Sequence, residues 1–408
     1  MLQPAQVWGG TMLKLGIDPA DGVRRGTVDP SHQSRHMQDG TRCGRFLCPA
    51  ELLILAGCVA LSINACGGGS GGGNSDGYHQ VDLMCFKSGG CTRGATFSLA
   101  VRNAWGVADH GGIAVAGNRE GVASCYLDEG QPRPLDPCLA VIPLTAQNTS
   151  SHASPTGIVF NNSSEFVIRN GAKPAPAAAL VATEEGTIAG INLSVDGQFA
   201  VVAIDNSSTN ARYTGLALGG EQNRFLYVAN FQNASVDVFD GTFAAVTPRG
   251  NFADADIPAD FAPFGIQNLA GELFVTYAKQ GGGGTTDLAG DGNGYVSVFD
   301  GDGNFLRRFA SRGPLNSPWG IARAPAGFGR FGGAIIIANH GNGRFNAFDS
   351  SGALQGQLET PGGKPVAVEG LWGVAGAEPT ANVPAALYFT AGPHDGDEGL
   401  FGRLEPSS

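Results

Sequence analysis

A short motif recurs six times along this chain: an aromatic residue or threonine, then glycine, then an aliphatic residue. Its copies centre on six glycines, Gly106, Gly157, Gly215, Gly265, Gly320 and Gly373. Successive glycines lie 50 to 58 residues apart. A regular period of this size indicates one supersecondary unit that is repeated, and each unit buries its apolar face against its neighbours. The chain therefore encodes a repeat architecture.

Short segments typical of β-strands follow each glycine. After Gly320 they are residues 334–339 (AIIIAN), 345–349 (FNAFD) and 354–358 (LQGQL). Such segments are rich in β-branched and aromatic residues, and Gly, Asn and Asp turns bound them. We therefore predict four short strands per repeat. Six four-stranded sheets arranged radially form an all-β, six-bladed β-propeller, which hides most strand edges inside the ring.

The glycine and the residue before it have expected structural roles. The innermost strands of a propeller converge on its axis, so a residue without a Cβ lets backbones approach where a larger side chain would clash. Trp105, Trp319 and Trp372, three of the four tryptophans, precede a repeated glycine. We expect their rings to wedge between neighbouring blades; stacking on a ligand is the alternative.

The N-terminal region predicts export. Residues 1–36 are polar and without period, so we predict that they are not part of the native product and that translation starts at Met37. Residues 37–65 carry two arginines followed by an apolar run, which is typical of a secretory signal peptide. The propeller itself is predicted over residues 78–405.

A cysteine follows the apolar run directly. Cys66 opens a Gly/Ser-rich tether, residues 66–77, and this order resembles a bacterial lipoprotein signal. We predict lipidation at Cys66, with Cys58 as the alternative acceptor. An ordinary cleaved signal and an uncleaved helix stay open, although the run is shorter than the 20 or so apolar residues of a membrane-spanning helix.

Four further cysteines, Cys85, Cys91, Cys125 and Cys138, lie at or before the first repeat. In an oxidising compartment their even number predicts two disulfides. Cys85 with Cys91 and Cys125 with Cys138 is one pairing, and the crossed pairings stay open. A zinc site is the alternative, but the four cysteines contain no CxxC pair.

The charge of the chain excludes one class of partner. It carries 36 acidic and 25 basic residues, a formal charge of −11 with a pI near 5.0. No face rich in Lys and Arg is available to neutralise phosphates, so nucleic acid is not an expected partner. We expect a monomer that contacts the membrane only through its lipid and that binds a small molecule or an envelope protein.

Candidate site residues come from the loops that surround a propeller's channel. Loops between the second and third strands of each blade, and loops leading into each innermost strand, share one face. Polar residues at these positions are Asn118, Asn230, Lys279, Asn339, His340, His394 and Asp395. Polar groups that converge from several blades suit a small-molecule site, although asparagines are also ordinary turn residues. We predict no cofactor; a divalent metal would fall to His340, His394 and Asp395.

Several longer stretches resemble one known family. Residues 262–268, 274–280, 314–320 and 387–393 resemble an uncharacterised bacterial family of exported proteins related to NHL-repeat six-bladed propellers. The resemblance covers nearly all of residues 105–404. It departs at Cys125 and Cys138, and at residues 395–400 (DGDEGL), where a histidine is expected before the glycine. It implies the fold and an exported location, but no activity.

Three classes of function remain. The first is a non-catalytic binding scaffold in the bacterial periplasm or on the outer membrane, which we predict. The second is a metal-assisted hydrolase or lyase resembling gluconolactonase-type propellers, in which a divalent ion polarises a carbonyl and activates water. The third is a structural envelope or matrix protein, in which the glycines at 281–284 would be surface spacers.

Overall fold

The computed structural model describes residues 76–86, 95–110, 112–126, 134–145 and 150–407, and all of them belong to one compact unit, residues 68–408. The predicted start at Met37, the signal segment 37–65 and the lipidation candidates Cys58 and Cys66 lie outside these residues. They stay predictions. No helix among the described residues is long and apolar enough to span a membrane.

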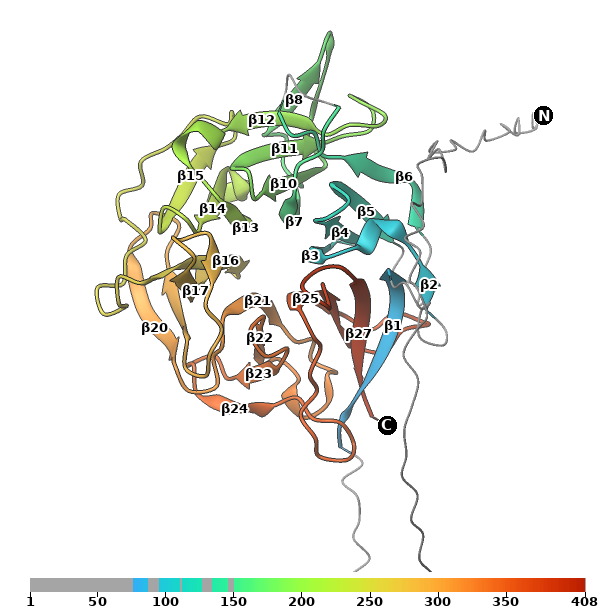
Figure 1. Ribbon diagram of the computed structural model, residues 1–408, viewed down its shortest axis with the longest axis vertical. Coiled ribbons are helices and arrows are strands. Elements are labelled where there is room, and N and C mark those ends of the chain that lie inside the picture. The colour runs from blue at the N-terminus through green and yellow to red at the C-terminus, as the bar shows by residue number, and fades with distance from the viewer. Residues whose placement is uncertain (1–75, 87–94, 111, 127–133, 146–149, 408) are drawn as a thin grey trace, which may run out of the picture. The chain divides into compact units, whose positions relative to one another are not determined.

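Six antiparallel sheets surround a common axis (Figure 1). Blade one contains β3 (Ala104–Asp109), β4 (Ile113–Gly117), β5 (Val122–Tyr126) and β6 (Pro134–Val141), and blade two contains β7 (Pro155–Phe160), β10 (Ala179–Thr183), β11 (Thr187–Ile191) and β12 (Val201–Asp205). Blade three contains β13 (Tyr213–Gly219), β14 (Phe225–Asn230) and β15 (Ser235–Asp240).

Blade four contains β16 (Phe261–Leu269), β17 (Glu272–Gly281), β19 (Gly294–Phe299) and β20 (Phe305–Ser311), and blade five contains β21 (Pro318–Arg323), β22 (Ile335–Asn339), β23 (Phe345–Phe348) and β24 (Leu354–Gln357). Blade six contains β25 (Leu371–Ala377), β26 (Ala386–Ala391), β27 (Gly399–Pro406) and β1 (Tyr78–Phe86). This confirms the predicted all-β, six-bladed β-propeller. Blade three differs slightly, because the backbones of Ala244 and Val246 bond to β15 where a fourth strand would lie.

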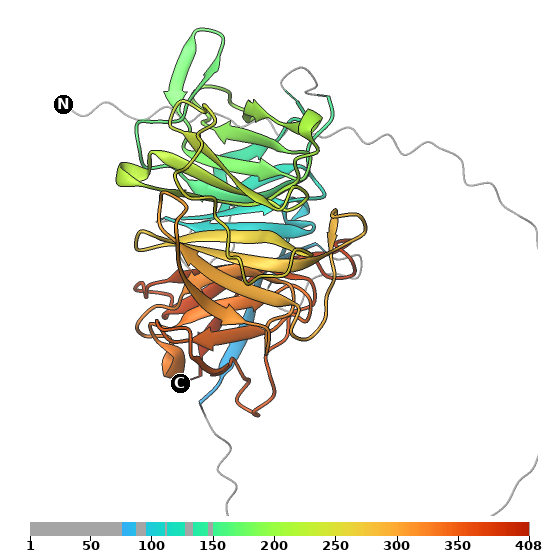
Figure 2. The same ribbon diagram turned by 90° about the vertical axis from the view of Figure 1, so that its left-hand side faces the viewer.

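Several smaller elements lie outside the four-stranded blades. β2 (Thr96–Phe97) pairs in parallel with β1, and β18 (Thr286–Asp287) pairs with the end of β17. The hairpin of β8 (Val167–Asn170) and β9 (Lys173–Pro176) projects away from blade two in both views (Figures 1 and 2). The described part of the chain also contains four 3₁₀ turns, η1 (Leu99–Val101), η2 (Ser207–Thr209), η3 (Glu221–Asn223) and η4 (Gly329–Phe331).

The N-terminal strand closes the ring. β1 pairs antiparallel with β27 from Tyr78 opposite Pro406 to Phe86 opposite Gly399, so the first strand that the structure describes is the fourth strand of the last blade. Joining both ends of the chain in one sheet links blade one to blade six.

The repeated glycines form the innermost ring, as predicted. A Cβ on Gly265 would lie 2.2 Å from the carbonyl oxygen of Trp319 in the next blade, and a Cβ on Gly320 would lie 2.6 Å from that of Trp372. A Cβ on Gly373 would meet the carbonyl oxygen of Trp105 at 2.6 Å, which closes the circle. At these three positions the backbone of the neighbouring blade therefore occupies the space that a Cβ would need.

Apolar side chains fill the six interfaces between neighbouring blades, and a further cluster of described residues lies on the axis. The axial cluster corrects the prediction for the tryptophans. Trp105 and Trp372 stack on each other at 3.7 Å between ring centroids, and Trp319 meets both edge-on. Because these rings gather on the axis rather than between blades, the three indoles plug the channel.

Two of the described cysteines are oxidised. Cys85 at the end of β1 and Cys125 in β5 each form a disulfide bond. Cys91 and the side chain of Cys138 lie outside the described part of the chain, so the pairing stays a prediction. A cysteine in a disulfide has no thiolate to offer a metal, which removes Cys85 and Cys125 from the alternative zinc site.

Candidate functional site at one mouth of the channel

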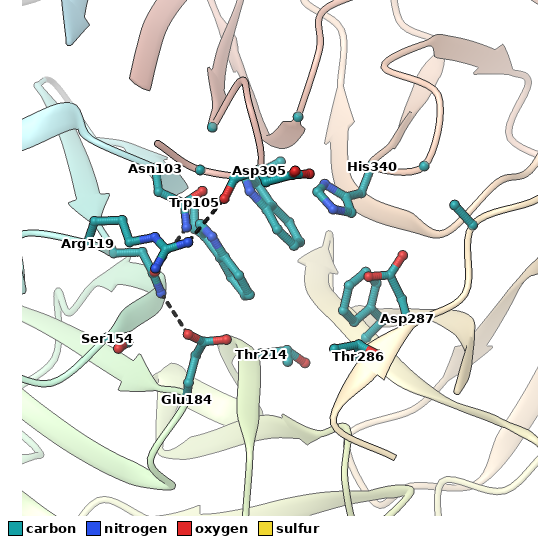
Figure 3. Close-up of a pocket in the computed structure, with 18 of the residues that line it drawn as sticks. Asn103, Trp105, Arg119, Ser154, Glu184, Thr214, Thr286, Asp287, His340 and Asp395 are labelled. Carbon is teal, nitrogen blue, oxygen red and sulfur yellow. Dashed lines mark hydrogen bonds between the residues drawn. The ribbon is translucent and has the colours of Figure 1, made fainter. Parts of the chain in front are cut away.

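One mouth of the channel opens into a cavity of about 730 Å³. Side chains from the loops between second and third strands line it: Asn118, Arg119, Glu184, Asp287, His340 and Asp395. Others come from the segments that lead into innermost strands: Asn103, Ser154, Arg212 and Glu369. Figure 3 shows six of these residues, Arg119, Ser154, Glu184, Asp287, His340 and Asp395, around the ring of Trp105. The two kinds of loop therefore share one face, as the sequence predicted.

The structure brings three of the seven predicted site residues into this cavity, Asn118, His340 and Asp395. Asn230 and Asn339 are buried in their own turns instead. Asn230 donates to Asp237 Oδ2 at 3.0 Å, and Asn339 donates to the carbonyl oxygen of Pro314 at 2.7 Å. These contacts fit the alternative role of turn residues.

The other two predicted residues also lie outside the cavity lining. Lys279 forms an ion pair with Asp260 at 3.1 Å. His394 is exposed, its backbone N–H donates to Glu369 Oε1 at 2.9 Å, and its Nδ1 lies 3.5 Å from Glu398 Oε2. His340, His394 and Asp395 therefore do not gather around one point. Among the described residues, no three His, Cys, Asp or Glu side chains come together as a metal site.

A charged pair that the sequence analysis missed forms one wall. Glu184 and Arg212 make a short salt bridge, and both side chains are mostly buried. Asn118 Nδ2 donates to the other carboxylate oxygen of Glu184 at 3.3 Å, while Asn103 donates to Asn118 Oδ1 at 2.9 Å. Burial raises the pKa of Glu184, and the Arg212 charge and the Asn118 hydrogen bond partly oppose this shift.

One signal could have identified Glu184. Asn118, Asn230 and Asn339 each come at or just after the end of the second strand of their blade, and Glu184 directly follows β10, the second strand of blade two. Aligning the repeats by their second strands would therefore have placed it at the mouth. Arg212 directly precedes β13, an innermost strand, in the second kind of mouth-facing loop.

His340 lies on the opposite wall and stacks on Trp372, with 3.6 Å between ring centroids. Its Nδ1 lies 3.1 Å from the carbonyl oxygen of Leu371. A carbonyl oxygen can only accept, so this contact assigns the proton of the neutral ring to Nδ1 and leaves Nε2 as an acceptor. Burial lowers the pKa of His340, although the nearby Asp287 charge opposes the shift. The imidazole is therefore neutral near pH 7.

The aromatic cluster forms the base of the cavity through Trp105, Phe264 and Trp372. Trp319 lies beneath and donates its indole N–H to the carbonyl oxygen of Thr214 at 2.9 Å. Trp105 is 5% exposed, and its indole N–H has no acceptor among the described residues. The base thus presents aromatic surface and one buried donor without a partner.

The other mouth of the channel has a different lining. Its cavity measures about 420 Å³ and is walled mostly by aliphatic residues such as Val107, Ile158, Leu218, Ile321 and Val374. A narrow space of about 30 Å³, bordered by five of the six repeated glycines, lies between the two mouths. Aromatic rings and tight backbone packing therefore separate the charged cavity from this second one, which we call the apolar cavity after its aliphatic strand residues, although Asp109, His110 and Arg323 also line it.

Fold and cavity together define a six-bladed propeller with a polar, aromatic-based channel mouth. The chain belongs to the same family as two proteins of Acanthamoeba polyphaga mimivirus. "Uncharacterized protein R648" is 33% identical over 301 residues, which cover 72% of this chain and 74% of that protein. "Uncharacterized protein L690" is 34% identical over 269 residues, which cover 64% and 70%.

A third mimivirus relative, "Uncharacterized protein R640", is 35% identical over 243 residues, but the chain spans only 44% of its length. These relatives are viral, so they do not support the bacterial family that the sequence resemblance suggested. No protein-family model matches the chain, so the predicted link to NHL repeats has no support from that comparison.

Solved propeller structures are similar at low identity. Virginiamycin B lyase from Staphylococcus aureus matches with a TM-score of 0.44 and 13% identity, over 81% of this chain and 99% of the enzyme. A protein of unknown function from Bacteroides thetaiotaomicron matches with a TM-score of 0.49 and 10% identity, over 81% and 76%. A putative gluconolactonase gives 0.45 and 13%, over 81% and 92%. At these values the similarities carry no inference about activity.

Proposed function

We propose that the protein is a binding scaffold that holds a small molecule in the charged channel mouth. One observation carries this proposal: every blade contributes a polar or charged side chain to the same cavity. The six are Asn118, Glu184, Arg212, Asp287, His340 and Asp395, in blade order. Convergent polar groups above an apolar base are the usual composition of a small-molecule site, and about 730 Å³ suits such a ligand.

The glycine-rich segment 281–284 supports binding over a purely structural role. β17 ends within it, and the residues that follow, Thr285, Thr286 and Asp287, line the cavity. Pairing of β18 with β17 fixes this loop over the mouth. A segment that serves only as a surface spacer has no need of such positioning.

We extend the proposal to the location of the protein. Export through residues 37–65 and lipid attachment at Cys66, with Cys58 as alternative, would place the propeller in an oxidising compartment. The disulfide bonds of Cys85 and Cys125 support such a compartment, because cytosolic thiols are kept reduced. Mass spectrometry of the membrane fraction tests the anchor: a mature N-terminus without lipid at either cysteine would reject it.

Intrinsic fluorescence of the full chain tests the binding site. With Trp8 changed to phenylalanine, the remaining tryptophans, Trp105, Trp319 and Trp372, all lie in the axial cluster. Ser154→Phe narrows the cavity from a partly exposed position, and Gln198→Phe adds the same ring at an exposed position outside it.

Compounds from a diverse small-molecule library should quench or shift the emission of the Trp8→Phe protein. The effect should disappear in Ser154→Phe and persist in Gln198→Phe. Failure to find a compound with this pattern would reject the proposed binding function.

A further inference from the structure

The charged mouth has an acidic side and a side with a free arginine. The present inference rests on the proposed function and specifies the chemical class of the ligand. Figure 3 shows Arg119 on one side of the Trp105 ring and Asp287 on the other, with His340 on the Asp287 side. The formal charges around the rim are two arginines, Arg119 and Arg212, against four carboxylates, Glu184, Asp287, Glu369 and Asp395. Arg212 and Glu184 neutralise each other, which leaves Arg119 facing the acidic side.

One side of the cavity offers hydrogen-bond acceptors. His340 presents Nε2, because its Nδ1–H is bonded to Leu371. The carboxylates of Asp287 and Asp395 make no hydrogen bond or ion pair with another described residue, and both residues line the cavity. Three acceptors on one side of the cavity suit a group with several N–H donors and a positive charge.

The opposite side offers donors. The guanidinium of Arg119 has five N–H donors, and Nη2 uses one of them on the carbonyl oxygen of Asp395 at 3.1 Å. The side chain is exposed, so the remaining donors are accessible from the cavity. Trp105 lies beside it in Figure 3 and adds an indole N–H that is buried and without an acceptor among the described residues. A buried donor without a partner indicates an unmet need for an acceptor.

We infer that the ligand is a small zwitterion, with an ammonium group toward His340, Asp287 and Asp395 and a carboxylate toward Arg119. The aromatic base lies between the two sides and suits a short hydrocarbon body. Charge-assisted hydrogen bonds at both ends fix the orientation of such a molecule. An uncharged ligand would leave the charged groups on both walls without partners.

Calorimetric titration of the full chain tests this assignment with defined probes. They are the ω-amino acids from glycine through γ-aminobutyrate to longer homologues, with n-alkylamines and n-alkanoates of matched length. The series is needed because the best separation between the charges is part of the result. At least one ω-amino acid should bind roughly 10-fold more tightly than its matched amine and its matched alkanoate.

Two substitutions test the binding of the ammonium end and of the carboxylate end separately. Asp287→Asn keeps the shape and should weaken ω-amino acids and amines by roughly 10-fold to 100-fold while leaving alkanoates unchanged. Arg119→Gln should weaken ω-amino acids and alkanoates and leave amines unchanged. Asp302→Asn and Arg249→Gln remove the same charges from an exposed pair outside the cavity, and they should alter none of the affinities.

A third variant tests the role of His340 as an acceptor. His340→Phe retains a ring against Trp372 but removes Nε2, so it should weaken amines and ω-amino acids without affecting alkanoates.

The inference fails if no ω-amino acid binds, if its binding is no tighter than that of the matched amine or alkanoate, or if Asp287→Asn and Arg119→Gln leave the affinities unchanged. The proposed function would still stand in those cases, provided that library compounds bind and Ser154→Phe blocks them. If Ser154→Phe blocks no compound, the binding function itself is rejected.

Discussion

The two mouths of the channel are built from the same six repeats and yet differ in chemistry. One mouth gathers Arg119, Glu184, Arg212, Asp287 and His340. The other is walled mainly by aliphatic side chains, with charged residues at its margin. Within β3 the transition takes three residues: Trp105 borders the charged cavity, Gly106 borders the narrow centre, and Val107 borders the apolar cavity.

The difference shows where this fold allows variation. The apolar mouth is formed largely by the innermost strands themselves, whose residues must also pack against neighbouring blades. The charged mouth is formed by loops that leave one strand and enter the next. Loops tolerate changes in length and composition without loss of the core. A site with chemistry of its own is therefore expected at the loop-built mouth.

The largest expected effect comes from the glycine ring that joins the two mouths. Gly265→Ala would place a Cβ 2.2 Å from the carbonyl oxygen of Trp319, a backbone atom that cannot move aside alone. We expect a loss of about 3 kcal/mol in the free energy of unfolding, the upper end for overpacking. Denaturation in guanidinium chloride, followed by circular dichroism, measures it.

Alanine substitutions at two other glycines, with more space around them, serve as comparisons. A Cβ on Gly215 would come no closer than 3.3 Å to its neighbours, so Gly215→Ala should be much milder than Gly265→Ala. Gly197 has open space around it, and Gly197→Ala should leave stability nearly unchanged. If all three substitutions had equal effects, backbone approach would not explain the repeated glycine.

The regular spacing of the repeats was sufficient to predict most of this architecture. Six glycines at regular spacing predicted six blades, and the general position of propeller loops located the mouth and three of its residues. The lengths of individual strands could not be predicted from the repeat pattern. β17 has ten residues against five in β22, so Lys279 lies within a strand and bonds to Asp260, while the loop that follows brings Asp287 over the mouth.

The next prediction concerns the stability that two tryptophans of the axial cluster contribute. Trp319→Phe removes the hydrogen bond from the indole N–H to the carbonyl oxygen of Thr214. Trp105→Phe removes an indole N–H that has no acceptor among the described residues. Trp319→Phe should therefore lower the free energy of unfolding by about 1 kcal/mol more than Trp105→Phe, the net value of one buried hydrogen bond. Equal losses would show that the two indoles contribute through packing alone.

The charged wall predicts a dependence on pH. A carboxyl whose pKa is higher in the folded state favours folding in its protonated form. The contribution of Glu184 is therefore fully present below its unfolded pKa, about 4.3, and is lost as the pH rises through the raised folded value. Glu184→Gln removes this titration, so the wild type should lose stability relative to the variant as the pH rises.

Arg212 stays charged throughout this range, so losing its partner adds only a constant offset to the Glu184→Gln curve. Urea denaturation at several pH values measures the slope, and Glu378→Gln, at an exposed position outside the cavity, should follow the wild type. Parallel curves for the wild type and Glu184→Gln would contradict the burial of a carboxyl in this wall.

The smallest effect is expected at the apolar mouth. Arg323 is exposed there, and its Nη1 donates to the carbonyl oxygen of Gly333 at 3.2 Å. Because the aromatic plug and the glycine ring separate it from the charged cavity, Arg323→Gln should change the affinity for any ligand by less than about twofold. Arg119→Gln removes the same charge from the other mouth and should weaken carboxylate ligands clearly. If calorimetry showed equal losses for both variants, the ligand would be responding to the overall charge of the channel rather than to one mouth.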